Sequence, residues 1–188
     1  MDSHDKQKKE SSSITLLTQD KQSELLEVTN EGMDYLNQLT SNFICTITVT
    51  GTQHCEKSSF ANLIIGDKDT FNISKTTSGI NMWGQPIVHQ DNTDLLVFDT
   101  EGYIKNINAN TNYEKQTFIM SCLLSSILVF HTDDCLTNCI QKFVNLAKES
   151  LNIMKKSEDK ELTHNDMPIV YFILHNNSAD QNSVNAQF

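Results

Sequence analysis

A lysine and two serines follow a short polar loop in the segment GTQHCEKSSF, residues 51–60. Gly51 ends an apolar run, and Lys57 and Ser58 take the places that the phosphate-binding pattern G-x-x-x-x-G-K-[ST] gives to lysine and hydroxyl. In such a loop the backbone N–H groups and a helix N-terminus hold phosphate oxygens, the lysine reaches the β- and γ-phosphates, and the hydroxyl binds Mg²⁺. Glu56 stands at the second glycine of the pattern. The segment therefore predicts a phosphate-binding loop with one departure.

Two further segments add groups that a metal-bound triphosphate needs. DTEG, residues 99–102, ends a second apolar run, so Asp99 is placed to hold Mg²⁺ through water and the Gly102 amide to contact a γ-phosphate. TTSGINMW, residues 76–83, lies between the loop and DTEG and supplies a threonine as a further metal ligand. The three segments together predict a site for a nucleoside triphosphate.

Strands alternating with helices would position these groups. Apolar, β-branched runs predict buried strands at 42–51, 93–99, 125–131 and 167–175, and helical spacing predicts helices at 30–40, 58–66, 113–123 and 134–156. Such alternation implies right-handed crossovers. The fold class predicted is α/β, a mainly parallel sheet with helices on both faces.

Length and charge limit the alternatives. A chain of 188 residues fits one domain with a real core, preceded by a polar segment, residues 1–20, that we expect to be a disordered arm. With 14 Lys+Arg against 24 Asp+Glu, the net charge of −10 opposes binding to nucleic acid, and no apolar stretch is long enough for a membrane helix. The five cysteines form an odd set without a CxxC pair, which predicts reduced thiols, no disulfide, no zinc and a cytoplasmic protein.

The order and spacing of the motifs resemble those of the GTPase domain of the guanylate-binding proteins, to which the atlastins are related. The resemblance covers roughly residues 30–180 and is carried by the loop, SGINMW, LLVFDTEG, LLSSILVF and ILHNNSAD. It implies a dynamin-like large GTPase with a Ras-like sheet, of P-loop NTPase type, with residues 21–188 as a partial G domain that is incomplete at the C-terminus. GTP and GDP would be its ligands, Mg²⁺ its cofactor, and a nucleotide-dependent homodimer through the G-domain face its assembly.

The resemblance also assigns roles to individual positions. Catalysis would involve Thr77, Glu101 and the degenerate finger position His54, and Mg²⁺ would be held by Ser58, Thr77 and Asp99. Nucleotide contacts are expected from Gly51, Cys55, Glu56, Lys57, Ser58, Ser59, Thr77, Asp99, Gly102, His175 and Asn176.

Three departures from the family pattern predict weaker chemistry. The carboxylate of Glu56 would repel a polyanion by up to about 4 kcal/mol at 4 Å and an effective dielectric near 20, unless it turns toward solvent. In the family that the sequence resembles, the position of His54 holds an arginine that acts as an internal finger on the transition-state charge. A largely neutral imidazole cannot supply such a permanent planar cation. His175 and Asn176 replace an Arg-Asp pair, which removes the carboxylate that would accept two guanine N–H bonds.

The sequence also permits two other functions. The departures favour, as the leading rival to a GTP-hydrolysing domain, a pseudo-GTPase that keeps the fold as an interaction module. An ATPase is the third candidate, because the base-recognition pair is altered.

Overall fold

The computed structural model describes residues 13–20, 22, 25–41, 43–73, 77–88, 93–102, 112–154 and 168–175, with side chains in the long last helix described as far as residue 149. In chain order the elements are β1 (Ser13–Gln19), β2 (Leu26–Val28), α1 (Asn30–Leu36), β3 (Phe43–Gly51), α2 (Lys57–Ile65), β4 (Ile80–Trp83), β5 (Ile87–Val88), β6 (Thr93–Thr100), α3 (Asn112–Leu123), β7 (Ile127–Thr132), α4 (Leu136–Met154) and β8 (Ile169–Leu174).

The sheet has eight strands in the order β2-β1-β4-β6-β3-β7-β8, with β5 pairing to β6. The pairs β6–β3, β3–β7 and β7–β8 are parallel, whereas β4, β5, β1 and β2 are attached antiparallel. The prediction of a mainly parallel sheet is confirmed for this central block, which carries the loop motifs at its carboxyl edge. The antiparallel extension was not predicted.

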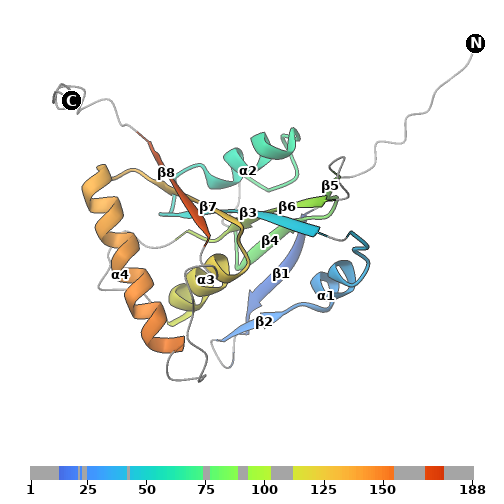
Figure 1. The fold of residues 1–188 in the computed structure, drawn as a ribbon, viewed down its shortest axis with the longest axis horizontal. Coiled ribbons are helices and arrows are strands. Elements are labelled where there is room, and N and C mark those ends of the chain that lie inside the picture. Colours follow the sequence, from blue (N-terminus) through green and yellow to red (C-terminus); the bar gives the residue numbers. More distant parts are fainter. Residues whose placement is uncertain are drawn as a thin grey trace, which may run out of the picture.

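Helices cover both faces of the sheet, as predicted. On one face Val49 and Val97 pack against Ala61 of α2, and on the other the alternate residues Leu96 and Phe98 belong to a cluster with α1 and α3. A third cluster joins α3, β7 and α4. Figure 1 shows α2 above the central strands β3, β6 and β7, and α1 and α3 below these three strands in that view.

The expected disordered arm is wrong for residues 13–19, which form β1. This strand lies between β2 and β4, and Leu16 and Leu17 are each only 3% exposed. The segment SITLLTQ lacks the regular apolar alternation that would predict a strand by itself. The segment forms a strand because β4 supplies a hydrogen-bonding edge and because Leu16 and Leu17 pack into the apolar cluster that contains residues of α1 and α3.

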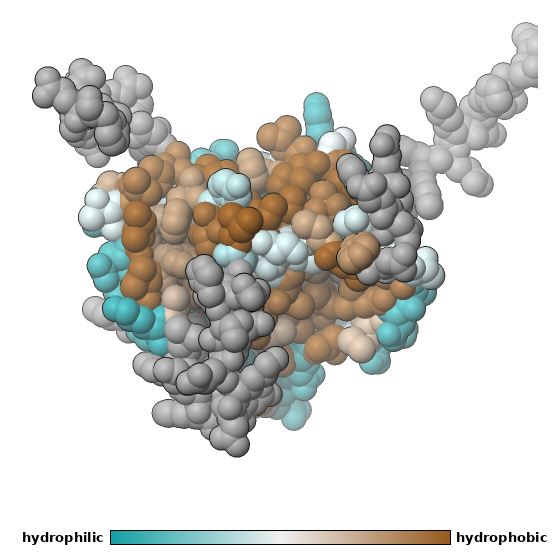
Figure 2. Space-filling model, in the orientation of Figure 1, coloured by the Kyte–Doolittle hydropathy of each residue, from teal (hydrophilic) through white to brown (hydrophobic). Residues whose placement is uncertain are grey.

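Two strands are less buried than predicted. Residues Phe43 and Ile44 at the start of β3 are exposed, and β8, predicted to be buried, exposes Ile169 and Tyr171 by 62% and 56%. Much of the face seen in Figure 2 is accordingly hydrophobic. The apolar composition of β8 predicts a strand correctly, but it cannot tell whether another element covers that strand.

Candidate functional site

The loop after β3 meets the carboxyl ends of β6 and β7. Gly51 has φ of 134°, and a Cβ there would lie 1.9 Å from the carbonyl oxygen of His131, so a glycine is required where β3 approaches β7. The Thr52 N–H continues the pairing by donating to the same carbonyl over 2.9 Å. Helix α2 begins at Lys57 and ends at Ile65. Gly66 caps it in a left-handed conformation, which confirms the helix end predicted at this glycine.

Lys57 places a nearly buried ammonium group beside this loop. Its side chain is 8% exposed, and Nζ donates to the Thr52 carbonyl oxygen over 3.0 Å. Burial lowers the pKa of Lys57, while Asp99, Cys55 and Glu101 act in the opposite direction. A Cβ at Gly102 would lie only 2.5 Å from Nζ, so the DTEG backbone passes directly beside the ammonium.

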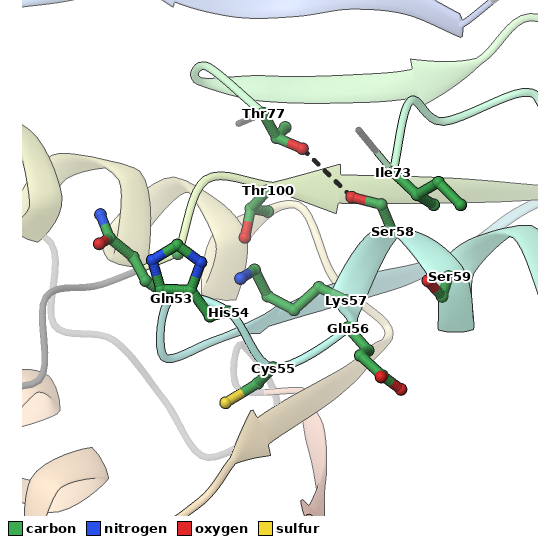
Figure 3. A pocket seen from close by; sticks show the side chains of 11 residues that line it. Gln53, His54, Cys55, Glu56, Lys57, Ser58, Ser59, Ile73, Thr77 and Thr100 are labelled. Carbon is green, nitrogen blue, oxygen red and sulfur yellow. Dashed lines mark hydrogen bonds between the residues drawn. The ribbon is translucent and has the colours of Figure 1, made fainter. Parts of the chain in front are cut away.

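Three oxygen-bearing side chains converge next to Lys57. Asp99 Oδ2 accepts hydrogen bonds from Ser58 Oγ over 2.6 Å and from Thr77 Oγ1 over 2.9 Å, and the two hydroxyls lie 3.2 Å apart (Figure 3). Asp99 is 1% exposed, and burial raises the pKa of its carboxyl against the opposing effect of these hydrogen bonds and of Lys57. Its second oxygen, Oδ1, is buried without a partner among the described residues. We call Ser58, Thr77 and Asp99 the oxygen cluster.

The oxygen cluster has the chemistry of a magnesium site. Mg²⁺ prefers one or two carboxylates with hydroxyl, water and phosphate oxygens, and a buried carboxylate oxygen without a partner is a group that such an ion would satisfy. No group of three or more His, Cys, Asp or Glu side chains with metal-binding geometry occurs in the described part of the chain. A metal at this site would thus depend on hydroxyl ligands.

A cavity of about 640 Å³ opens over the loop and the cluster. Of the predicted site residues it is lined by His54, Cys55, Glu56, Lys57, Ser58, Ser59, Thr77 and Gly102 (Figure 3). Gln53, Ile73 and Thr100 also line it and were not predicted. Gln53 and Thr100 lie within the motifs GTQHCEKSSF and DTEG, which mark them as candidates, whereas nothing in the sequence marks Ile73.

Glu56 and His54 both have left-handed backbone conformations, with φ of 50° and 62°. Glu56 caps α2 without a side-chain hydrogen bond, is exposed, and points away from the Lys57 ammonium (Figure 3). The left-handed region favours glycine and costs another residue about 1 to 2 kcal/mol. The backbone at Glu56 therefore has the shape that suits the glycine of the pattern, although the residue is different.

Glu101 lies behind the cavity and does not line it. Its Oε2 accepts hydrogen bonds from the Tyr113 hydroxyl over 2.7 Å and from the Gly79 N–H over 3.3 Å. Asp99 and Gly51 are likewise absent from the lining; Asp99 faces it through Ser58 and Thr77. Sequence reasoning missed Tyr113, because no spacing rule connects the start of α3 with DTEG.

On the base-recognition side, His175 also lies outside the cavity lining. Its Nε2 is 2.8 Å from Nδ1 of His131, and the same Nδ1 is 3.1 Å from the Cys55 carbonyl oxygen. Burial lowers the pKa of His131 to about 4, reinforced by His175 and Lys57 and opposed by the hydrogen bond to Cys55. His131, the last but one residue of β7, had no predicted role in the site. The predicted position Asn176 lies outside the described residues.

The cysteines are all free thiols. Cys55 is buried in the loop, 2.7 Å from Thr52 Oγ1, and the others lie on β3, on α3 and around the start of α4. Among the described helices, none combines the length and apolar composition required to cross a bilayer.

The parallel core, the loop between β3 and α2 and the buried lysine define an α/β domain of the P-loop NTPase type. Residues 23–173 match the family model of the guanylate-binding protein, N-terminal domain. The chain belongs to this family.

Similar proteins carry the same family name. The chain is 25% identical to guanylate-binding protein 5 of Homo sapiens over 149 residues, which cover 77% of this chain and 25% of the relative. It is 28% identical to guanylate-binding protein 4 of Homo sapiens over 115 residues, 59% of this chain and 18% of the relative. With guanylate-binding protein 7 of Mus musculus the identity is 23% over 158 residues, 80% and 25% respectively. The match thus spans a quarter or less of each relative's length.

Proposed function

We propose that this domain binds GTP together with Mg²⁺ and hydrolyses it slowly to GDP and phosphate. The observation that carries the proposal is the convergence of the Lys57 ammonium and the oxygen cluster on one cavity at the carboxyl edge of the parallel strands. Membership of the family supports guanine nucleotide as the ligand.

The loop and Lys57 would hold the phosphates. The N-terminus of α2 presents backbone N–H groups and the positive end of its dipole to the cavity, and the ammonium lies beside them. Mg²⁺ would be held by the oxygen cluster and would neutralise charge on the β- and γ-phosphates. Because Glu56 points outward, its carboxylate leaves the phosphate space free.

Hydrolysis would take place near Thr77 and Gly102, where a water can be positioned for in-line attack on the terminal phosphate. Oε2 of Glu101 already accepts hydrogen bonds from Tyr113 and Gly79, which makes this oxygen a poor acceptor for a proton from such a water. His54 lines the cavity but brings no permanent cation to the transition state, and an arginine finger contributes about 10³ to 10⁵ in rate. These two features support slow turnover.

The proposal extends to assembly and location. Pairing of two copies through the face that holds the cavity would depend on bound nucleotide, and sedimentation with and without a non-hydrolysable GTP analogue would measure it. Reduced cysteines support a cytoplasmic location.

Titration calorimetry with a non-hydrolysable GTP analogue tests binding. We expect Mg²⁺-dependent affinity tighter than millimolar, and a loss of about 100-fold in Lys57→Ala because a charge-assisted contact to phosphate disappears. Lys68→Ala, which removes an exposed lysine beyond α2, is the matched control and should bind like the wild type. Millimolar or weaker affinity that Lys57→Ala leaves unchanged would overturn the proposal.

Two rival functions are separated by related measurements. His54 and Glu56 favour a pseudo-GTPase interaction module, which would show no increase in melting temperature with saturating GTP, since a ligand that binds the folded state must stabilise it. The altered base-recognition position His175 favours an ATPase, which would be stabilised more by ATP than by GTP in the same assay. Recovery of phosphate release in a Glu56→Gly, His54→Arg double variant would indicate that both positions limit turnover.

A further inference from the structure

Tyr113, near the N-terminus of α3, connects two segments of the site that are far apart in sequence. Its hydroxyl donates to Glu101 Oε2 over 2.7 Å and accepts from the Gly79 N–H over 2.9 Å. The backbones of Gly79 and Glu101 are also joined directly, by the Glu101 N–H donating to the Gly79 carbonyl oxygen over 2.9 Å. One phenol thus completes a closed set of hydrogen bonds between three parts of the chain.

Both connected segments continue into the cavity. Gly79 lies two residues after Thr77, a member of the oxygen cluster, and Glu101 directly precedes Gly102, whose backbone lies beside the Lys57 ammonium. A shift of either segment relative to the other would change the spacing between Thr77 and Gly102.

The hydroxyl, and not only the ring, is required for this connection. Tyr113 is 8% exposed, so its hydroxyl would be costly to bury without partners, and it uses both its donor and its acceptor capacity here. Burial and the Glu101 carboxylate raise the pKa of Tyr113 to about 12, against the opposing effect of Gly79 and Ser78. The phenol therefore remains protonated at neutral pH and can donate its hydrogen bond to Glu101.

We infer that Tyr113 is a positioning residue that fixes the Thr77–Gly79 segment against Glu101–Gly102 so that both act on the terminal phosphate of a triphosphate. The inference rests on the proposed function and adds to it a determinant of triphosphate over diphosphate binding. A diphosphate would be held by Lys57 and the loop, whereas the side-chain hydrogen bonds of Tyr113 go to Gly79 and Glu101. Only a terminal phosphate needs both connected segments at a fixed spacing.

Tyr113→Phe tests the inference because it removes the hydroxyl and keeps the ring. Calorimetry with a non-hydrolysable GTP analogue and with GDP, both with Mg²⁺, should show affinity for the analogue reduced about tenfold and affinity for GDP changed by less than about twofold. Tyr35→Phe is the matched control: its hydroxyl is buried without a hydrogen-bond partner among the described residues, and it packs in the α1–α3 cluster. That variant should bind both nucleotides like the wild type.

Hydrogen exchange of the nucleotide-free protein gives a second readout. The Gly79 N–H donates to the phenol over 2.9 Å and, more weakly, to Glu101 Oε2 over 3.3 Å. Tyr113→Phe leaves it only the longer bond, so exchange of the Gly79 amide should be faster in this variant but not in Tyr35→Phe, while α2 amides keep the wild-type rate in both.

The outcomes separate the inference from the proposed function. Equal losses for the analogue and GDP, or wild-type values for both, would overturn the positioning role and leave GTP binding standing. An unchanged Gly79 exchange rate would also overturn it. A wild-type protein that binds neither nucleotide would overturn the proposed function, and the role of Tyr113 with it.

Discussion

The phosphate side and the base side of the site differ in what their polar groups contact. On the phosphate side, Lys57, Ser58 and Thr77 line a cavity. Asp99, which accepts hydrogen bonds from both hydroxyls, has a buried carboxylate oxygen without a partner among the described residues. On the base side, His175 is bonded to His131, which in turn contacts the back of the loop at Cys55. One side is arranged to receive a ligand, and the other uses its polar groups within the protein.

This difference indicates which recognition the domain can supply. Phosphate and metal chemistry are common to all nucleoside triphosphates, whereas a base is identified by groups placed along its edge. We expect affinity to come from the phosphate side and little discrimination between bases from His175.

The largest expected effect is a pH dependence of the free energy of unfolding that arises from His131 on the base side. The folded-state pKa of His131 is about 4, below the unfolded value of about 6.5. The folded protein therefore binds fewer protons than the unfolded chain between these values, so stability is full above pH 6.5 and falls as the pH drops toward 4, by up to about 3 kcal/mol.

Urea unfolding between pH 7.5 and 4 measures this effect. His131→Asn should reduce the pH dependence in this window, whereas His54→Gln, at an exposed position, should keep the wild-type dependence. An identical pH dependence in His131→Asn and the wild type would remove His131 as the buried neutral group.

The next effect concerns the oxygen cluster. Asp99→Asn keeps the size of the side chain but removes the charge that would attract Mg²⁺, so affinity for the GTP analogue with Mg²⁺ should fall about 10-fold to 100-fold and become nearly independent of the metal. Calorimetry with Mg²⁺ and with EDTA measures both quantities. Asp69→Asn changes an exposed carboxylate in the turn after α2 and serves as the control. Retained metal dependence in Asp99→Asn would place Mg²⁺ elsewhere.

A smaller effect is expected at the departure from the loop pattern. Glu56→Gly relieves a left-handed non-glycine conformation and should raise the free energy of unfolding by about 1 kcal/mol, because the gain exceeds the entropy cost of glycine. Chemical denaturation measures it, with Glu31→Gly in helix α1 as a contrasting variant that should lose stability. Destabilisation by Glu56→Gly would show that the carboxylate itself stabilises the loop.

The smallest effect is expected from the base-recognition position. His175→Ala should change the ratio of GTP to ATP affinities by less than about threefold, since an imidazole bonded to His131 is not available to a base. Competition of the two nucleotides against a fluorescent analogue measures the ratio. A larger change would move base recognition to His175 and break the proposed division of the site.

Sequence reasoning predicted the parts of the site in which a motif fixes the backbone. The loop, Ser58 and Asp99 could be placed because Gly51 and DTEG end parallel strands, and such ends meet at one edge of the sheet. The helix after the loop and its end before Gly66 could also be predicted, because helical spacing and a capping glycine are local features of the sequence.

The remaining features depend on contacts that no local pattern encodes. The strand at residues 13–19 forms on an edge provided by β4, and its first residue, Ser13, pairs with Trp83, which lies 70 residues later in the chain. No motif in the sequence marks Tyr113 or His131. Their hydrogen bonds to Glu101 and Cys55 exist because the fold brings these distant segments together. The exposure of β8 depends on neighbours, which composition cannot specify.

The hydrogen bond from Lys57 to the Thr52 carbonyl oxygen has a consequence for the ligand-free protein. Without an anion in the cavity, the Lys57 ammonium still donates one hydrogen bond to its own loop, so removal of a phosphate does not leave this buried cation without an acceptor. This internal acceptor favours a loop that keeps its conformation when no anion is present.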